Sequence, residues 1–265
     1  MSHVNSAGTD NHIWRLGSTL AIRMPKVDWA AESVARECEF LPRFRGLPLA
    51  IPNVAARGMP DEGYPYVWSV CEWIEGEAER FDTLNDPVQA ARDLAEFILA
   101  MRTRDTTGGP VSGPGNNLRG GPLAPRDRHT RKAIANLAHE IDAPRAIGMW
   151  DAALAAPTSE NSDAWIHSDL KEGNLLMRDG RLAAVIDFGM LAVGDEAVDL
   201  TPAWSCFEGP ARIAFLAALD PGSACVARAK GWTLSIAAIT WAYYRDKNPT
   251  LTQISQQTLH RLLSE

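Results

Sequence analysis

The sequence predicts an α+β fold with two lobes, in which a small β-rich N-terminal lobe precedes a larger, mainly helical C-terminal lobe. Two observations predict this order. Short β-rich runs with alternating apolar residues gather before residue 73, whereas longer runs with helical apolar spacing dominate after it. A chain of 265 residues is also long enough to bury a substantial core. We therefore expect one lobe at residues 1–73 and a second at residues 74–265.

The N-terminal lobe is predicted to hold a hairpin, a helix and a further strand. Residues 13–24 alternate between apolar and polar side chains and are interrupted at Gly17 and Ser18, which is typical of a hairpin. A helix is predicted at residues 30–41, where apolar residues recur along one face. Residues 66–73 are rich in β-branched and aromatic side chains, which favours a strand.

The C-terminal lobe is predicted to consist mostly of helices. The first covers residues 86–101, with Asp86 as its N-cap. Residues 106–125 are rich in glycine and proline and predict a long loop. Further helical segments are expected at residues 126–154 (one or two helices), 199–207, 209–219, 223–245 and 251–263.

Composition excludes several classes of function. A formal net charge of −7 argues against a broad nucleic-acid surface, which needs clustered lysine and arginine. The four cysteines form no C-x-x-C pair, so neither a zinc site nor a disulfide framework is predicted, and a cytoplasmic location is the default. The polar first ten residues lack the apolar run of a signal peptide, and no stretch reaches the length of a membrane span. We expect no nucleic-acid or membrane partner.

The segment 165–189 carries the chemistry. It contains His167-x-Asp169 and, five residues after the aspartate, Asn174, followed by the triplet that begins at Asp187. Phosphoryl transfer needs hard oxygen ligands that hold magnesium, and a carboxylate that orients the attacking hydroxyl and accepts its proton. Asp169 is the candidate base, and Asn174 and Asp187 are the candidate metal ligands.

A predicted hairpin explains how these groups meet. Residues 175–177 and 182–186 are apolar and flank Asp179-Gly180, a strong two-residue turn signal. Pairing of the two strands would bring Asn174 next to Asp187 at the open end of the hairpin.

The combined pattern resembles the catalytic and metal loops of the protein-kinase-like superfamily, and within it the aminoglycoside phosphotransferase family. Three features favour that family over protein kinases. Ser168, and not arginine, stands between His167 and Asp169. Residues 194–200 follow the Asp-Phe-Gly triplet almost at once, which leaves no room for an activation loop. Residues 15–25 are similar to the family's first-lobe pattern. The resemblance extends from about Asp10 to the C-terminus.

The resemblance implies a nucleotide site for ATP or GTP together with Mg²⁺. Arg23 occupies the position of the basic residue that contacts the nucleotide phosphates, and Glu37 that of its helix partner. Arginine stands where protein kinases have lysine, and it can hold phosphate with two parallel bonds. Cys71 and Trp73 belong to the hinge, residues 71–74, whose backbone would meet the base of the nucleotide.

The resemblance also implies roles around the base. Lys171 is the candidate contact of the γ-phosphate, and His167 is placed with the catalytic group, either as a catalytic residue or as one that fixes the loop. Asp199 is expected to cap the next helix, and Asp195 is either a turn residue or a site carboxylate.

Relatives of this kind usually begin with a helix and a strand before the loop that covers the nucleotide. Here only ten residues precede Asn11, and residues 6–10 are a short remnant of that loop. We therefore expect a shortened N-terminus that lacks one strand, which would expose a sheet edge.

The predicted function is ATP-dependent transfer of a phosphoryl group to a hydroxyl of a small molecule, with an aminoglycoside-like acceptor favoured. Macrolides, choline, sugars and other alcohols remain alternative acceptors, and a non-catalytic relative that binds a nucleotide or ligand remains an alternative function. A protein kinase is disfavoured by the missing activation loop, and a dinucleotide enzyme by the absence of G-x-G-x-x-G after a strand. The family resemblance suggests antibiotic resistance as a role, and the chain is expected to be a monomer or a dimer. Carboxylates that could line an aminoglycoside cleft are Glu208, Asp246 and Glu265.

Overall fold

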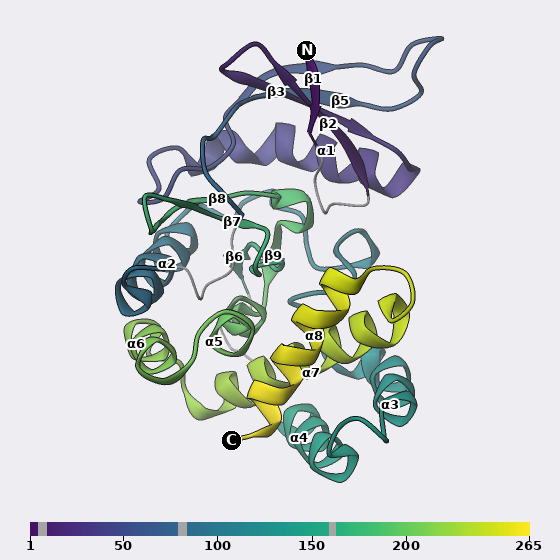
Figure 1. Cartoon of the computed structure of the whole chain (residues 1–265), viewed down its shortest axis with the longest axis vertical. Coiled ribbons are helices and arrows are strands. Elements are labelled where there is room, and N and C mark those ends of the chain that lie inside the picture. Colours follow the sequence, from purple (N-terminus) through teal and green to yellow (C-terminus); the bar gives the residue numbers. More distant parts are fainter. Residues whose placement is uncertain (5–9, 79–83, 159–162) are drawn as a thin grey trace.

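The computed structural model describes residues 1–4, 10–78, 84–158 and 163–265. Figure 1 shows two lobes, one above the other: a twisted sheet with a single helix at the N-terminal end, and a larger group of helices below it. The predicted α+β class and its order of lobes are confirmed.

The upper lobe is built on a five-stranded antiparallel sheet with the order β1-β2-β3-β5-β4. The predicted hairpin is confirmed, since Leu16 pairs with Leu20 across the turn that contains Gly17 and Ser18. The strand expected within residues 66–73 is also present, whereas β4 carried no signal that we recognised. The strands are β1 (Ser2–Val4), β2 (Asn11–Leu16), β3 (Leu20–Pro25), β4 (Val54–Gly58) and β5 (Trp68–Glu72).

The prediction that one strand of this sheet is missing is wrong. β1 pairs with β2 in antiparallel register, with Ser2 opposite Arg15 and Val4 opposite Ile13. A strand of three residues can form here because β2 is already paired with β3, so β1 only adds hydrogen bonds at the edge of an existing sheet. Most of the loop that was expected to cover the nucleotide, residues 5–9, lies outside the described residues.

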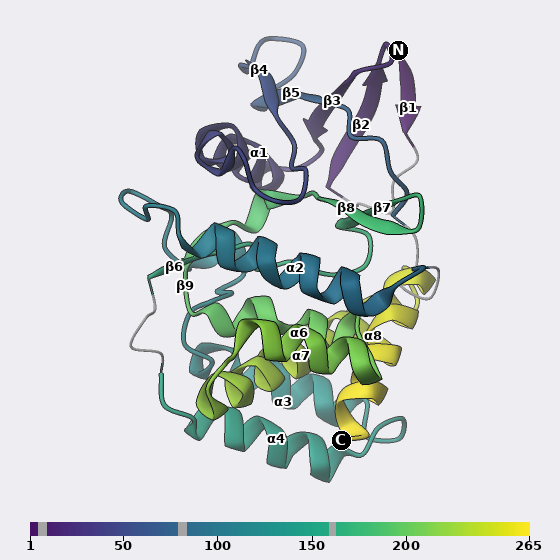
Figure 2. The ribbon, with the colours of Figure 1, turned by 90° about the vertical axis from the view of Figure 1, so that its left-hand side faces the viewer.

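One helix, α1 (Asp28–Phe40), packs between the sheet and the lower lobe. A helix was predicted here from the spacing of the apolar residues. Figures 1 and 2 show α1 beneath the sheet, on the side that faces the helical lobe. Its buried face includes Val34 and Phe40, and also the charged residue Glu37. A buried carboxylate on an otherwise apolar face requires a partner, which the site supplies.

The lower lobe is mainly helical, as predicted, although the helix expected at residues 199–207 is shorter: residues 196–200 form a 3₁₀ turn and only Pro202–Ser205 are α-helical. Asp86 caps the first helix, since its carboxylate accepts a hydrogen bond of 2.9 Å from the backbone N–H of Gln89. The segment 126–154 forms two helices. Among the described residues, no helix is both long and apolar enough to cross a bilayer. The helices are α2 (Pro87–Arg102), α3 (Asp127–Asn136), α4 (Ala143–Ala155), α5 (Pro202–Ser205), α6 (Gly209–Leu219), α7 (Ser223–Tyr244) and α8 (Pro249–Leu263).

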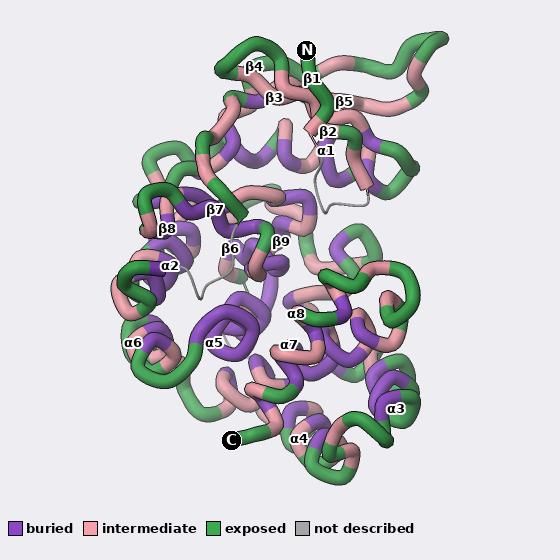
Figure 3. The backbone as a smooth tube through the Cα atoms, in the orientation of Figure 1, coloured by how far each residue is buried: buried purple, intermediate pink, exposed green. Residues whose placement is uncertain are grey.

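The core of this lobe gathers around α7, whose neighbours are α3, α4 and α8. Figure 3 shows that buried positions are concentrated among these helices and beneath α1. Trp232 and Trp241 of α7 are almost fully buried, so they belong to the core and not to an exposed substrate platform. Tyr243, by contrast, is exposed at the end of the helix.

Two small sheets lie between the lobes and contain parts of the segment 165–189, in which the candidate site residues were predicted. β6 (Ala164–Ile166) pairs with β9 (Ala192–Gly194), and β7 (Leu175–Arg178) pairs with β8 (Arg181–Val185). The predicted turn is confirmed: Asp179 and Gly180 have φ values of 55° and 72°, the left-handed conformation that a two-residue hairpin turn requires at both positions.

Candidate active site

The β7–β8 hairpin brings the two halves of the motif together. Asn174 precedes β7 and Asp187 follows β8, and the backbone N–H of Ile186 donates a hydrogen bond of 2.9 Å to the Asn174 carbonyl. This bond closes the open end of the hairpin. The metal-ligand candidates therefore sit on adjacent backbone positions although thirteen residues separate them in sequence, as the hairpin predicted.

Asp169 is a buried carboxylate surrounded by donors. Lys171 Nζ lies 2.6 Å from its Oδ2, and Asn174 Nδ2 lies 3.0 Å from the same oxygen. Burial by itself would raise the pKa of Asp169, but the charges of Lys171 and Arg119 outweigh it and hold the pKa well below its usual range. Asp169 is therefore negatively charged, and its carboxylate is held between the positive charges of Lys171 and Arg119.

Arg119 is a residue of this site that the sequence did not predict. It lies in the loop between α2 and α3, forms an ion pair with Asp169 Oδ1, and donates a hydrogen bond of 2.8 Å to the Ser168 carbonyl. Just before it, Asn117 and Leu118 both have positive φ values, 56° and 61°, which turn the chain towards the catalytic loop. The glycine- and proline-rich composition marked the loop, but no motif singled out its arginine.

His167 is fully buried, and both of its ring nitrogens are used. Nδ1 accepts a hydrogen bond from the Asp169 backbone N–H, so Nε2 carries the proton and donates to the Ile186 carbonyl at 3.1 Å. Burial lowers the pKa of His167, which keeps the ring neutral. These contacts connect the catalytic loop to the end of β8, and they favour a loop-fixing role for His167 over proton transfer.

Asp199 does not cap the next helix, so that prediction is wrong. Its carboxylate accepts hydrogen bonds from the backbone N–H groups of His167 (2.8 Å) and Ser168 (2.7 Å), where Ser168 has a φ of 65°. Asp199 thus holds the catalytic loop in a strained turn from a distant part of the chain. Burial raises its pKa, although the two donated hydrogen bonds and the neighbouring His167 act in the opposite direction.

Asp195 is the residue that caps the 3₁₀ turn Glu196–Leu200, accepting from the Ala197 N–H at 3.1 Å. It also forms a two-bond ion pair with Arg228 of α7, at 2.6 and 3.0 Å. Of the two alternatives for Asp195, these contacts favour the structural one, because both carboxylate oxygens are engaged away from Asp169.

Arg23, Glu37 and Asp187 form a chain of charges between the lobes. Arg23 on β3 forms an ion pair with Glu37 of α1, and its Nη2 lies 3.2 Å from Asp187 Oδ1. Burial would lower the pKa of Arg23, but the two carboxylates outweigh it and raise that pKa, so the guanidinium is charged. The Glu37 side chain is only 1% exposed, whereas that of Asp187 is 47% exposed. Asp187 is therefore the carboxylate of this group that a ligand can reach.

The residues after Asp187 explain its orientation. Asp187 has a φ of 65°, and Phe188 is buried with its ring centre 4.6 Å from that of His167. A side chain at Gly189 would place its Cβ 2.9 Å from Ser33 of α1, so only glycine allows α1 to approach this closely. The buried phenylalanine and the small glycine together turn Asp187 towards the space between the lobes.

The predicted hinge connects β5 to the lower lobe. Cys71 is buried in β5, and the Trp73 backbone N–H donates a hydrogen bond of 2.7 Å to the Thr19 carbonyl. The Arg15 guanidinium lies 4.5 Å from the centre of a Trp73 ring. The Trp73 N–H is thus already paired with the β2–β3 turn.

The donor set fits magnesium only if the nucleotide completes it. The described residues contain no group of three or more histidine, cysteine, aspartate or glutamate side chains that could hold a metal ion. Asn174 donates through its amide nitrogen to Asp169, which leaves the amide oxygen for a cation, and Asp187 adds a half-exposed carboxylate. Mg²⁺ typically takes one or two protein oxygens and fills its octahedron with phosphate and water. The residues present match that pattern.

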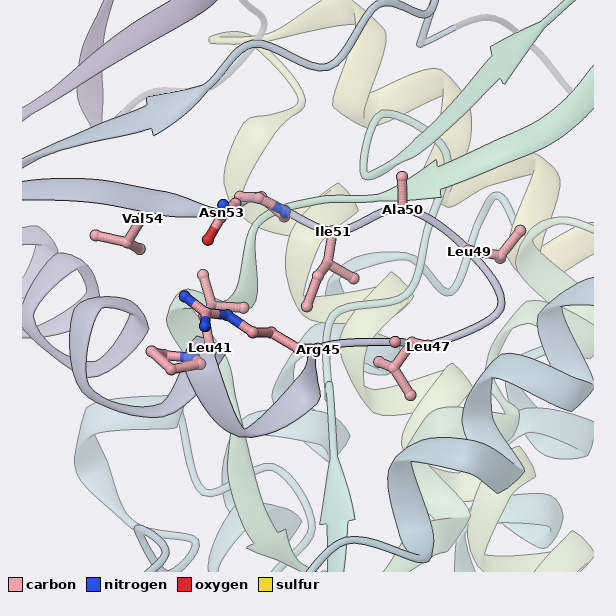
Figure 4. A pocket seen from close by; sticks show the side chains of 11 residues that line it. Leu41, Arg45, Leu47, Leu49, Ala50, Ile51, Asn53 and Val54 are labelled. Atoms are coloured by element: carbon pink, nitrogen blue, oxygen red, sulfur yellow. The ribbon is translucent and has the colours of Figure 1, made fainter.

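Away from these residues, the described structure has a pocket lined by aliphatic side chains. It has a volume of about 250 Å³ and lies between the end of α1 and the segment that leads to β4 (Figure 4). Of the predicted site residues, all of which are described, none lines it. The lining is mostly aliphatic, with Arg45 as its charged residue, so this pocket lacks the groups that phosphoryl transfer needs.

The carboxylates expected to line an aminoglycoside cleft are mostly committed to ion pairs. Glu208 pairs with Arg261 of α8. Glu265 lies 2.6 Å from both Arg212 and Lys230, and also accepts from the Trp204 indole. These contacts hold α6, α7 and the C-terminus together. Asp246 is exposed just after α7.

Comparison with known proteins agrees with this geometry. The sequence profile of the phosphotransferase enzyme family matches residues 3–232. No curated protein matches the chain in sequence. Solved structures with a similar fold include the GDP complex of wild-type aminoglycoside 2′-phosphotransferase-IIIa, with a TM-score of 0.70, 15% identity, and coverage of 99% of this chain and 92% of that one.

Two further structures extend the comparison. The gentamicin complex of APH(2″)-IIa has a TM-score of 0.65 and 19% identity, with coverage of 100% of this chain and 91% of that one. Macrolide 2′-phosphotransferase type I has a TM-score of 0.61 and 16% identity, with coverage of 96% and 89% respectively. At these identities the likeness establishes the protein-kinase-like fold.

Proposed function

Because this chain belongs to the phosphotransferase enzyme family, we propose that it transfers the γ-phosphoryl group of ATP or GTP to a hydroxyl group of a small molecule. Two of the similar structures are complexes of aminoglycoside phosphotransferases, one with GDP and one with gentamicin, and a third is a macrolide phosphotransferase. Aminoglycosides are therefore the first acceptors to test, and macrolides the second. A cytoplasmic location and a monomeric or dimeric state stay predictions.

One observation carries the proposal: Asp169, Asn174 and Asp187 come together in one place. Asn174 Nδ2 lies within hydrogen-bond distance of Asp169 Oδ2, and the end of the hairpin places the Asn174 backbone beside Asp187. Asp187 in turn contacts Arg23 of the sheet. The candidates for a base, two metal ligands and a phosphate-binding cation are thus neighbours, and these are the groups that phosphoryl transfer requires.

Each residue then has a role that follows from its surroundings. Asp169 would orient the acceptor hydroxyl and accept its proton as the new P–O bond forms and the bond from the γ-phosphorus to the β–γ bridging oxygen breaks, which releases ADP or GDP. Lys171, already 2.6 Å from Asp169, would neutralise the transferring group, and Arg23 would hold the nucleotide phosphates from the sheet. Asn174 and Asp187 would hold Mg²⁺, which when bound supplies charge neutralisation on the phosphates. His167 and Asp199 would keep the loop in place without touching the substrate.

A second candidate function is that of a relative that binds a nucleotide without efficient transfer. One observation favours it: both oxygens of Asp169 are engaged, Oδ1 by Arg119 and Oδ2 by Lys171 and Asn174. Against this alternative, β1 completes the strand that was expected to be missing, and Arg23 is paired with Glu37.

Thermal unfolding with Mg-ATP and with Mg-GTP tests the proposal. A ligand that binds the folded state raises the midpoint in proportion to RT ln(1 + [L]/Kd), about 2.7 kcal/mol at a hundredfold excess. We expect a magnesium-dependent rise that Asp187→Ala abolishes and that Asp246→Ala, a matched loss of an exposed carboxylate, retains. Release of ADP in the presence of kanamycin, gentamicin or a macrolide then tests transfer. Loss of the rise in both variants, or in neither, would count against the assigned nucleotide site.

A further inference from the structure

Arg126 is a half-buried arginine that has no carboxylate partner among the residues that the structure describes. Its Nε donates a hydrogen bond of 2.9 Å to Ser235 Oγ, and its Nη1 donates one of 2.8 Å to the Asn117 carbonyl. The guanidinium also lies 5.3 Å from the centre of a Trp232 ring. Neutral partners satisfy hydrogen bonds, but they leave the positive charge uncompensated in a partly dry environment.

The carboxylate next to it in sequence is directed elsewhere. Asp127 accepts hydrogen bonds of 2.7 Å from both Arg131 and the Trp150 indole. The chain therefore has an acid beside Arg126 and uses it to stabilise α3 and α4. The positive charge of Arg126 remains available to a ligand.

A second arginine, Arg119, belongs to the loop segment that Arg126 contacts, since Arg126 Nη1 binds the carbonyl of Asn117, two residues before Arg119. Burial lowers the pKa of Arg126 to about 10, and the positive charge of Arg119 contributes to that shift. Arg119 donates a hydrogen bond from Nη1 to Asp169, but its Nε is buried and has no hydrogen-bond partner among the described residues. Two cations that repel each other inside a protein are both relieved when an anion binds between them.

The location of this pair indicates which ligand it serves. Arg119 touches Asp169, beside which the acceptor hydroxyl has to lie, and Arg126 is tied to α7 in the helical lobe. The nucleotide groups, by contrast, come from β3, α1 and the end of β8 through Arg23, Glu37 and Asp187. Arg126 thus lies on the helical side of the base, where an acceptor would bind.

We infer that Arg119 and Arg126 form an oxyanion subsite for the acceptor, so that the acceptor carries a carboxylate, phosphate or sulfate group near its reactive hydroxyl. The inference rests on the proposed phosphotransferase function and narrows its substrate class. The planar guanidinium group matches these oxyanions with paired hydrogen bonds. A polycationic aminoglycoside would instead bring ammonium groups towards two arginines, while Glu208 and Glu265, its expected partners, are held in ion pairs.

Binding of inorganic sulfate tests the subsite without any turnover. Thermal unfolding is followed in sodium sulfate and in sodium chloride of equal ionic strength, with and without saturating Mg-ATP. We expect sulfate to raise the midpoint of the wild type by about 2 °C or more over chloride. Arg126→Gln should lose this increment and Arg126→Lys should lose most of it. Arg128→Gln, the loss of an exposed arginine in the first turn of α3, should keep it.

Two results would overturn the inference. The first is an equal sulfate increment in Arg126→Gln and the wild type. The second is an increment that Mg-ATP abolishes, since the sulfate would then occupy the place of a nucleotide phosphate. The proposed function fails separately, when Mg-ATP itself gives no rise in the same samples, so the two failures are distinguishable.

Acceptor assays then separate the sources of the oxyanion. Gluconate carries a carboxylate and glucose 6-phosphate carries a phosphate, and glucose is their uncharged control. We expect ADP release to depend on an anionic probe, with a KM that Arg126→Gln raises at least tenfold. Turnover of kanamycin that exceeds that of both anionic probes and is unchanged in Arg126→Gln would contradict the inference.

Discussion

Arg23 Nη2 lies 3.2 Å from Asp187 Oδ1, although 164 positions separate the two residues in sequence. This contact joins the sheet of the upper lobe to the loop that follows β8 in the lower one. Because Arg23 also pairs with buried Glu37, one guanidinium links β3, α1 and the candidate metal loop. Arg23 is therefore one of the groups that join the lobes at the site, together with Arg36 of α1, which donates a hydrogen bond to the Gly189 carbonyl.

Replacing that cation should destabilise the protein strongly. Arg23→Met leaves Glu37 buried without its partner, which typically costs about 3–5 kcal/mol. The double variant Arg23→Met/Glu37→Gln should recover a substantial part of the loss, because the unpaired charge is gone. Urea unfolding of the two single variants and the double variant measures the coupling. Strictly additive effects of the two changes would contradict the ion pair.

Asp169→Asn should remove phosphoryl transfer while the protein still folds. A missing general base reduces the rate by about 10²–10⁴-fold, and the amide cannot accept the hydroxyl proton. The variant should still show the Mg-ATP-dependent rise in midpoint, since Asn174 and Asp187 are unchanged. ADP release with the best acceptor measures the loss. Normal turnover in Asp169→Asn would exclude Asp169 as the base.

The stability of the protein should depend on pH through His167. Its folded pKa is lowered by burial, so the unfolded state binds the proton more readily. The contribution of His167 to stability is complete above its unfolded pKa of about 6.5 and is lost as the pH falls towards the folded pKa. His167→Asn should therefore show a smaller loss of stability between pH 7.5 and pH 5.5 than the wild type, as urea unfolding at the two pH values would reveal. Parallel losses would mean that other groups control this range.

The cysteines should react slowly in the native protein. Burial raises the pKa of Cys206 to about 12 and those of Cys38 and Cys225 to about 11. The pKa of Cys71 is raised as well, and burial is again the main cause. At pH 8 a thiol with a pKa near 11 is only about 0.1% thiolate, whereas an unfolded one is about a quarter thiolate. Titration with a chromogenic disulfide reagent should show four slow thiols that become fast in urea. A fast thiol in the native state would contradict the burial of that cysteine.

The local elements could be predicted because their signals lie within a few residues. The alternation of residues 13–24 and the turn at Asp179-Gly180 each specify a hairpin through backbone geometry. Asp86 specifies the start of α2 through one side-chain hydrogen bond to its own first turn. The spacing of Asp169, Asn174 and Asp187 is likewise a local property of one loop and one hairpin, so the candidate site was readable before the fold.

Other features depend on partners that are distant in sequence. β1 is only three residues long and is formed by pairing with β2, so its own sequence is too short to show a strand pattern. Asp199 resembled a helix cap by position, but its carboxylate accepts hydrogen bonds from the backbone of His167 and Ser168, 32 and 31 positions away. Arg119 lies in a segment that composition describes only as a loop, and Arg126 is the first residue of a segment that was predicted only as helical.

The sequence by itself therefore determined the class of fold, the order of the lobes and the residues of the catalytic motif, because these follow from short-range periodicity, turn chemistry and spacing. Only the tertiary structure decided which charges meet. Arg119 reaches Asp169 across 50 positions, and Arg126 is left without an acid because Asp127 turns to Arg131 and Trp150. Electrostatic partners are chosen by distances in space, and a linear sequence does not contain those distances until the chain has folded.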